Sequence, residues 1–140
     1  MKLFYFFLAA LFITSVASAQ SAWKLKLDKK ELLNATQENM EKNTVVLTNA
    51  ELKKGKLLTL QYGAAGEDAQ WQRSITIYDP QDQELKKFTG RSMSLSASAL
   101  RKLLSQSSTL HIYTMAIPKD PNLAATVRVR RVHLATVQLK

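Results

Sequence analysis

The sequence contains no cysteine, which excludes disulfide bonds and lipid attachment through an N-terminal cysteine. It also lacks a Gly-x-Ser-x-Gly motif, and neither of its two histidines is accompanied by a recognisable nucleophile and acid. These absences argue against a serine hydrolase and favour a non-enzymatic protein. Because no disulfide is available, a hydrophobic core must stabilise the fold.

A long apolar run is present only near the N-terminus. Residues 3–13 are eleven consecutive apolar or aromatic residues that follow Lys2, and Ala17-Ser18-Ala19 forms a small-x-small cleavage site. The alternative is a membrane anchor, but a helix that spans a bilayer needs roughly 20 apolar residues, and Thr14 ends this run early. Residues 1–19 are therefore predicted to be a secretory signal peptide.

Cleavage would leave residues 20–140, which is the size of one domain and leaves no room for a second. No transmembrane segment is expected after cleavage. Small secreted eukaryotic domains usually depend on disulfides, so an exported chain without cysteine is more typical of the bacterial periplasm or of bacterial secretion. The oligomeric state cannot be predicted from the sequence.

The protein is basic. Twenty Lys and Arg residues stand against eleven Asp and Glu, and removal of Lys2 lowers the net charge from +9 to +8. This charge favours an acidic partner such as an acidic glycan, a lipid headgroup or an acidic envelope protein. The candidate binding residues are Arg128, Arg130, Arg131 and Tyr113. They could also contact nucleic acid, but export argues against such a partner.

Most of the chain has the pattern of short strands. Trp23, Leu25 and Leu27 alternate with Lys24 and Lys26, which places the apolar side chains on one face of a strand. Similar runs are found at residues 44–48, 56–62, 71–78, 84–88, 92–96, 109–116 and 126–139. This spacing predicts an all-β protein, an antiparallel β-sandwich of seven to eight strands with one or two short helical crossovers.

An internal repeat supports the helical crossovers. Residues 47–54 align without gaps on residues 95–102, and each copy resembles a strand, a helical turn and a strand. In the first copy Thr48 and Glu51 have the spacing of a capping box, and Gly55 could end the turn. We interpret the copies as two crossovers, although a coincidence among common residues is the alternative.

The apolar face changes partway along each of the last two expected strands. If these strands pair as an antiparallel hairpin centred on Asn122, His111 lies opposite His133 and Tyr113 lies opposite Arg131. The change of face predicts a bulge near Arg130-Arg131. The alternative is an arch that places the two strands in different sheets.

The predicted hairpin would bring two imidazoles together. His111 and His133 are therefore the candidate metal ligands, because neutral imidazole binds zinc or copper well. Two ligands are too few for a complete site. The alternative is that both rings lie on a half-exposed sheet face and bond to their neighbours or to water, so no cofactor is predicted.

Trp71 is the remaining candidate. Glu67 and Asp68 precede it, and carboxylates beside an indole are typical of sugar-binding sites. Trp71 also shares its strand face with Ile75 and Ile77, which favours packing in the core instead. The sequence therefore leaves a carbohydrate-binding module as an alternative function.

The Trp-x-Leu-x-Leu pattern at residues 23–27 and the segment at residues 125–134 resemble small uncharacterised exported bacterial β-sandwich proteins. The resemblance implies a fold and a compartment but no catalytic residue. The leading hypothesis is an exported, non-enzymatic binding or structural domain that contacts an acidic partner through its basic surface or a sheet edge. The alternatives are a metal-binding protein or metal-dependent hydrolase, and the carbohydrate-binding module.

Overall fold

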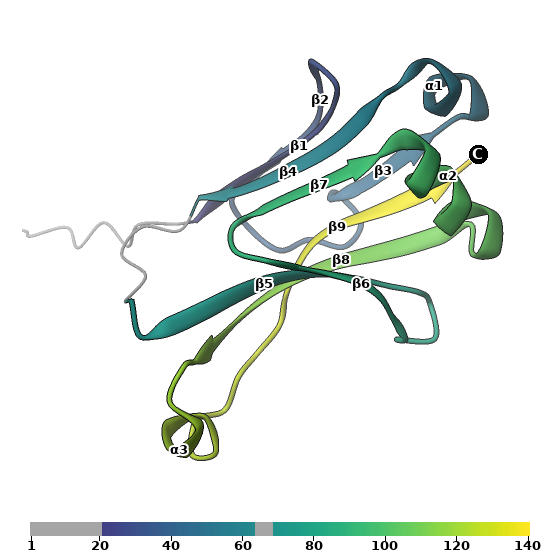
Figure 1. The fold of residues 1–140 in the computed structure, drawn as a ribbon. Coiled ribbons are helices and arrows are strands. Elements are labelled where there is room, and N and C mark those ends of the chain that lie inside the picture. Colours follow the sequence, from purple (N-terminus) through teal and green to yellow (C-terminus); the bar gives the residue numbers. More distant parts are fainter. Residues whose placement is uncertain (1–20, 64–68) are drawn as a thin grey trace, which may run out of the picture.

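The computed structural model describes residues 21–63 and 69–140, so the predicted signal peptide lies outside the described residues. Two sheets face each other as a β-sandwich, which confirms the predicted fold class (Figure 1). One sheet contains, in spatial order, β2 (Lys30–Ala35), β1 (Ala22–Leu27), β4 (Leu57–Gly63) and β7 (Ser92–Ser96). The other contains β3 (Thr44–Leu47), β9 (Val132–Leu139), β8 (Thr109–Pro118), β5 (Trp71–Tyr78) and β6 (Glu84–Thr89). Neighbouring strands are antiparallel except β3 and β9, which are parallel.

Two helices carry the chain between the sheets, as the internal repeat predicts. Helix α1 (Asn49–Lys54) joins β3 to β4, and helix α2 (Ala97–Gln106) joins β7 to β8. Their N-caps, Thr48 and Ser96, occupy equivalent positions of the repeat, and each hydroxyl accepts a backbone N–H at 3.2 Å. The equivalent leucines, Leu52 and Leu100, are both buried. A third helix, α3 (Pro121–Ala124), lies between β8 and β9.

The core lies between the inner faces of the two sheets. Alternation along each strand supplies its residues, and Leu25, Leu60, Ile75 and Ile112 are among those that are fully buried. The one indole within this core, Trp23, donates from Nε1 to the carbonyl oxygen of Leu134 at 2.8 Å. This bond connects β1 of one sheet to β9 of the other.

The described part of the structure has nine strands, one more than the largest number predicted. The additional strand is β2, which the sequence pattern did not predict. This strand lies at the edge of its sheet and pairs with β1 across a register shift at Leu25 and Lys26. Its two leucines, Leu32 and Leu33, are adjacent in sequence and only partly buried. An edge strand paired across an irregularity has no clear period of two, which is the signal that the other strands provide.

Strands β8 and β9 pair as neighbours in one sheet, so the predicted hairpin is confirmed, but its register is wrong. His111 pairs with Thr136 rather than His133, and Tyr113 pairs with His133 rather than Arg131. The bulge is not near Arg131, because the register shift leaves Leu134 as the extra residue of β9. Residues 126–131, expected to be strand, precede β9, which begins at Val132. Strand β8 keeps an unbroken register with β5, so the expected change of face is wrong for β8, whereas β9 does change face, at Leu134.

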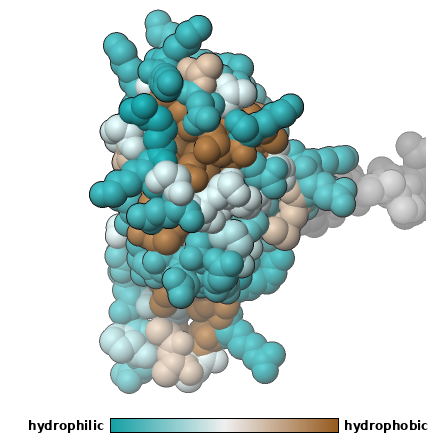
Figure 2. Space-filling view, turned by 90° about the vertical axis from the view of Figure 1, so that its right-hand side faces the viewer, coloured by the Kyte–Doolittle hydropathy of each residue, from teal (hydrophilic) through white to brown (hydrophobic). Residues whose placement is uncertain are grey.

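The side of the molecule that carries the helices and the C-terminus is mainly hydrophilic, with hydrophobic areas enclosed by polar ones (Figure 2). In the described residues the exposed large hydrophobic side chains are Met40, Val46, Leu57 and Leu123. No helix in this part of the chain is long and apolar enough to cross a membrane.

The burial of Leu27 and Ile77 predicts that Leu27→Ala and Ile77→Ala each lower the free energy of unfolding by about 2–5 kcal/mol. The loss arises from the removed apolar contacts and from the cavity that remains. Leu57→Ala is the matched control, because Leu57 is 40% exposed and its truncation should cost about 0.5 kcal/mol. Urea denaturation measures all three variants, and losses below about 1 kcal/mol in both core variants would contradict the assigned strand faces.

Candidate functional site

The two histidines lie on the outer face of the five-stranded sheet and share one hydroxyl. Nδ1 of His111 and Nε2 of His133 lie 2.9 Å and 2.8 Å from Oγ1 of Thr136. Their ring centroids are 6.3 Å apart, and the ring of Tyr113 lies 5.4 Å from that of His133. The two imidazoles therefore lie close together, as predicted, although His111 and His133 are not paired across the strands. The extra residue in β9 places His133 and Thr136 on the same face of the sheet.

His133 is the more enclosed of the two histidines. Its side chain is buried, the residue being 3% exposed, and among the described residues its Nδ1 has no hydrogen-bond partner. Burial lowers the pKa of His133, and the nearby imidazole of His111 lowers it further, although the carboxylate of Glu38 acts in the opposite direction. The ring of His133 is therefore held in its neutral form more strongly than that of an exposed histidine.

This arrangement does not supply a complete metal site. The described part of the chain contains no group of three or more His, Cys, Asp or Glu side chains placed to hold one ion. Structural zinc has four protein ligands and catalytic zinc three. The two imidazoles both bond to Thr136, but His133 is buried rather than half-exposed as the alternative interpretation of the sequence expects.

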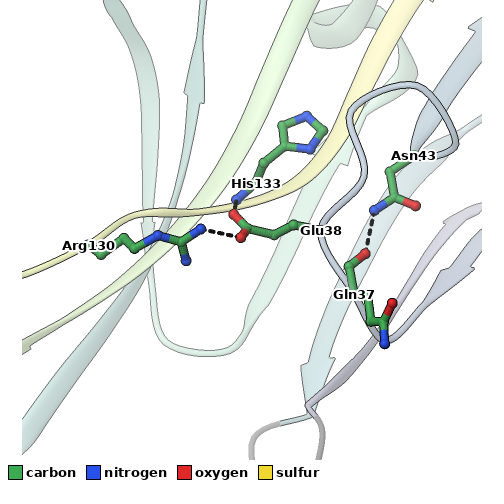
Figure 3. A network of polar contacts seen from close by, with 5 residues as sticks. All are labelled: Gln37, Glu38, Asn43, Arg130 and His133. Atoms are coloured by element: carbon green, nitrogen blue, oxygen red, sulfur yellow. Dashed lines mark hydrogen bonds and ion pairs between the residues drawn. The ribbon is translucent and has the colours of Figure 1, made fainter.

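The segment between β2 and β3 is attached to the start of β9 by Glu38. One carboxylate oxygen accepts the backbone N–H of His133 at 2.7 Å, and the other is ion-paired with the guanidinium of Arg130 (Figure 3). Burial opposes ionisation of Glu38, but these two hydrogen bonds outweigh it and lower its pKa. The amide of Asn43 donates to the carbonyl oxygen of Gln37 at 2.9 Å within the same segment.

Arg131 is also engaged within the protein. Its guanidinium carbon lies 4.1 Å from the ring centroid of Tyr113 and 5.1 Å from that of Tyr78. Nη1 lies 2.7 Å from a carboxylate oxygen of Asp82, and this hydrogen bond raises the pKa of Arg131. Of the three arginines predicted to bind an acidic partner, only Arg128 is exposed and has no ion pair in the described residues.

Trp71 opens onto a hollow of about 360 Å³, here named the Trp71 hollow. Its other lining residues are Gln72, Arg73, Thr89, Gly90, Arg91 and Lys119. Trp71 shares the inward face of β5 with Ile75 and Ile77, as its position predicts, but it is only half-buried. This end of β5 and β8 extends away from the four-stranded sheet (Figure 1), so the opposite layer does not cover it completely. The predicted neighbours Glu67 and Asp68 lie outside the described residues.

A second hollow, of about 380 Å³, lies on the outer face of the four-stranded sheet and is here named the lysine hollow. Its polar lining residues are Lys24, Lys26, Thr59, Gln61, Ser92 and Ser94. The hydroxyl of Ser92 donates to Oε1 of Gln61 at 2.9 Å, and no described carboxylate lines the hollow. Glu31, opposite Lys26 across β1 and β2, is on the same face but outside the lining.

Sequence reasoning did not identify the lysine hollow. The alternation of Lys24 and Lys26 with Trp23, Leu25 and Leu27 places both lysines on the outer face, and this signal was available. The sequence could not show that β4 and β7 follow β1 in the sheet. The hydroxyl and amide groups beside the lysines come from those two strands.

The depressed pKa of His133 predicts a specific loss of stability in mild acid. An unfolded histidine has a pKa of about 6.5, so below that pH the unfolded chain binds a proton more readily than the native protein. The free energy of unfolding should therefore fall as the pH decreases below about 6.5. The lowered pKa of Glu38 acts in a more acidic range, below about 4.3.

Urea denaturation between pH 7.5 and pH 5.5 tests this expectation in the wild type and in His133→Gln. The substitution removes the titrating ring, so the free energy of unfolding of the variant should depend less steeply on pH in this interval. Profiles of equal slope would show that His133 does not titrate differently in the folded and unfolded states.

No protein-family model matches the chain, and no curated protein matches it either.

Proposed function

We propose that this protein is an exported, non-enzymatic binding module that contacts an anionic partner through the outer face of its four-stranded sheet. The composition of the lysine hollow is the main support for this proposal. Two lysines, three hydroxyls and one amide line the hollow, and no described carboxylate lines it. The net charge expected after cleavage, +8, favours the same class of partner.

The position of the lysines suits an extended anionic surface. Lys24 and Lys26 are two residues apart on β1, so their Cα atoms are separated by about 7 Å along the strand. Their ammonium groups supply charge, while Thr59 and Ser94 can donate hydrogen bonds to anionic oxygens. In contrast, an anion that binds Arg130 or Arg131 must compete with Glu38 or Asp82.

The test compares two variants that lose the same charge. Lys24→Gln/Lys26→Gln removes both cations of the lysine hollow, whereas Lys53→Gln/Lys54→Gln removes two exposed lysines of α1. We expect the first variant to bind immobilised polygalacturonate, and vesicles that contain anionic lipid, about thirtyfold more weakly than the wild type. This follows from about 1 kcal/mol for each lysine near an anionic surface.

The control variant should remain within about threefold of the wild type. Binding of the wild type should also weaken as salt is added, because ions screen exposed charges. Equal losses in the two variants would show that net charge alone governs binding. A wild-type protein that binds neither polyanion at low ionic strength would contradict the proposed function.

A further inference from the structure

The lysine hollow and the Trp71 hollow are lined by consecutive residues at the start of β7. Ser92 lines the first hollow and Arg91 lines the second, and these residues are consecutive, with Cα atoms about 3.8 Å apart. The backbone also links the hollows, because the N–H of Tyr62, next to Gln61, donates to the carbonyl oxygen of Arg91 at 2.8 Å. One extended ligand could therefore contact both.

The Trp71 hollow offers groups that a simple anion site does not need. The half-buried indole of Trp71 presents an aromatic surface, on which the apolar C–H face of a sugar ring can pack. The ammonium of Lys119, an exposed residue, can pair with a carboxylate.

Arg73, in the wall of the Trp71 hollow, is fixed by contacts with buried side chains of the core. The guanidinium of Arg73 lies 4.6 Å from the ring centroid of Tyr62, and its Nη1 donates to Oγ1 of Thr114 at 3.0 Å. Tyr62 in turn stacks on Trp23, with 6.0 Å between ring centroids. Fixed side chains lose little conformational entropy when a ligand binds, so this wall is organised before binding.

We propose that the anionic partner is a linear acidic polysaccharide and that one of its sugar residues packs on Trp71 while the following residues extend over the lysine hollow. This inference rests on the proposed function, because it takes the lysine hollow as the surface that binds the polymer. The indole favours a sugar ring over a bare anion. The cations favour an acidic sugar over a neutral one.

Tryptophan fluorescence provides a direct test. Trp23 is 3% exposed and its Nε1 is hydrogen-bonded, so a change caused by a ligand reports on Trp71. The probes are a tetramer of galacturonic acid, a neutral cello-oligosaccharide of the same length, and inorganic phosphate at matched charge. We expect the emission to change with the uronate tetramer and not with the other two.

Calorimetric titration with the same tetramer measures affinity independently of fluorescence. Trp71→Ala should weaken binding at least about tenfold, and Trp71→Phe, which keeps a packing ring, should weaken it less. Lys119→Gln should weaken binding of the uronate tetramer severalfold. Urea denaturation identifies folded variants, and Trp71→Phe keeps the test decisive if Trp71→Ala does not fold.

The outcomes separate the inference from the proposed function. If Trp71→Ala binds the uronate tetramer as tightly as the wild type while Lys24→Gln/Lys26→Gln loses polyanion binding, the inference is wrong and the proposed function stands. An equal response to phosphate or to the neutral oligosaccharide would also overturn the inference. If Trp71→Ala loses the tetramer while the lysine variant retains all polyanion binding, the lysine hollow is not the binding surface and the proposed function fails.

Discussion

The arrangement of the sandwich depends on the contact between Trp23 and the bulge of β9. The bulge adds Leu134 to the strand, and the carbonyl oxygen of this residue accepts the indole N–H of Trp23 across the core. A buried indole N–H without an acceptor would cost about 1–3 kcal/mol, so the bulge and the tryptophan support each other. The same extra residue turns both His133 and Thr136 outward, although they are three positions apart, an odd separation that would place them on opposite faces of a regular strand.

The sequence was most informative where a local pattern determines local structure. The repeat placed both crossovers because an N-cap hydroxyl, an inward leucine and a preceding apolar strand recur at the same spacing. Thr48 and Ser96 cap their helices, and Leu52 and Leu100 are buried beneath them. Each of these features is set by residues within one or two turns, so sequence alone could predict them.

The features that were missed depend on contacts between distant segments. The register of β8 and β9 was wrong by two to three residues because a single added residue, Leu134, cannot be distinguished from a regular strand residue by hydrophobicity. Trp71 alternates in step with the core residues of β5, so its sequence position predicts the face on which it lies. It does not predict how far the opposite sheet extends over that face. The pairing of Arg130 with Glu38, 92 residues away in sequence, left no local signal.

This pairing changes how the positive charge should be interpreted. Counting basic residues treats every cation alike, whereas the fold divides them into two groups. Arg130 and Arg131 are ion-paired and therefore already have carboxylate partners, and the planar guanidinium suits such pairs and aromatic stacking. Lys24 and Lys26 line a hollow without a described carboxylate. An incoming anion must displace a carboxylate partner at Arg130 or Arg131, whereas Lys24 and Lys26 have no ion pair among the described residues, so an anionic partner is expected at the lysines.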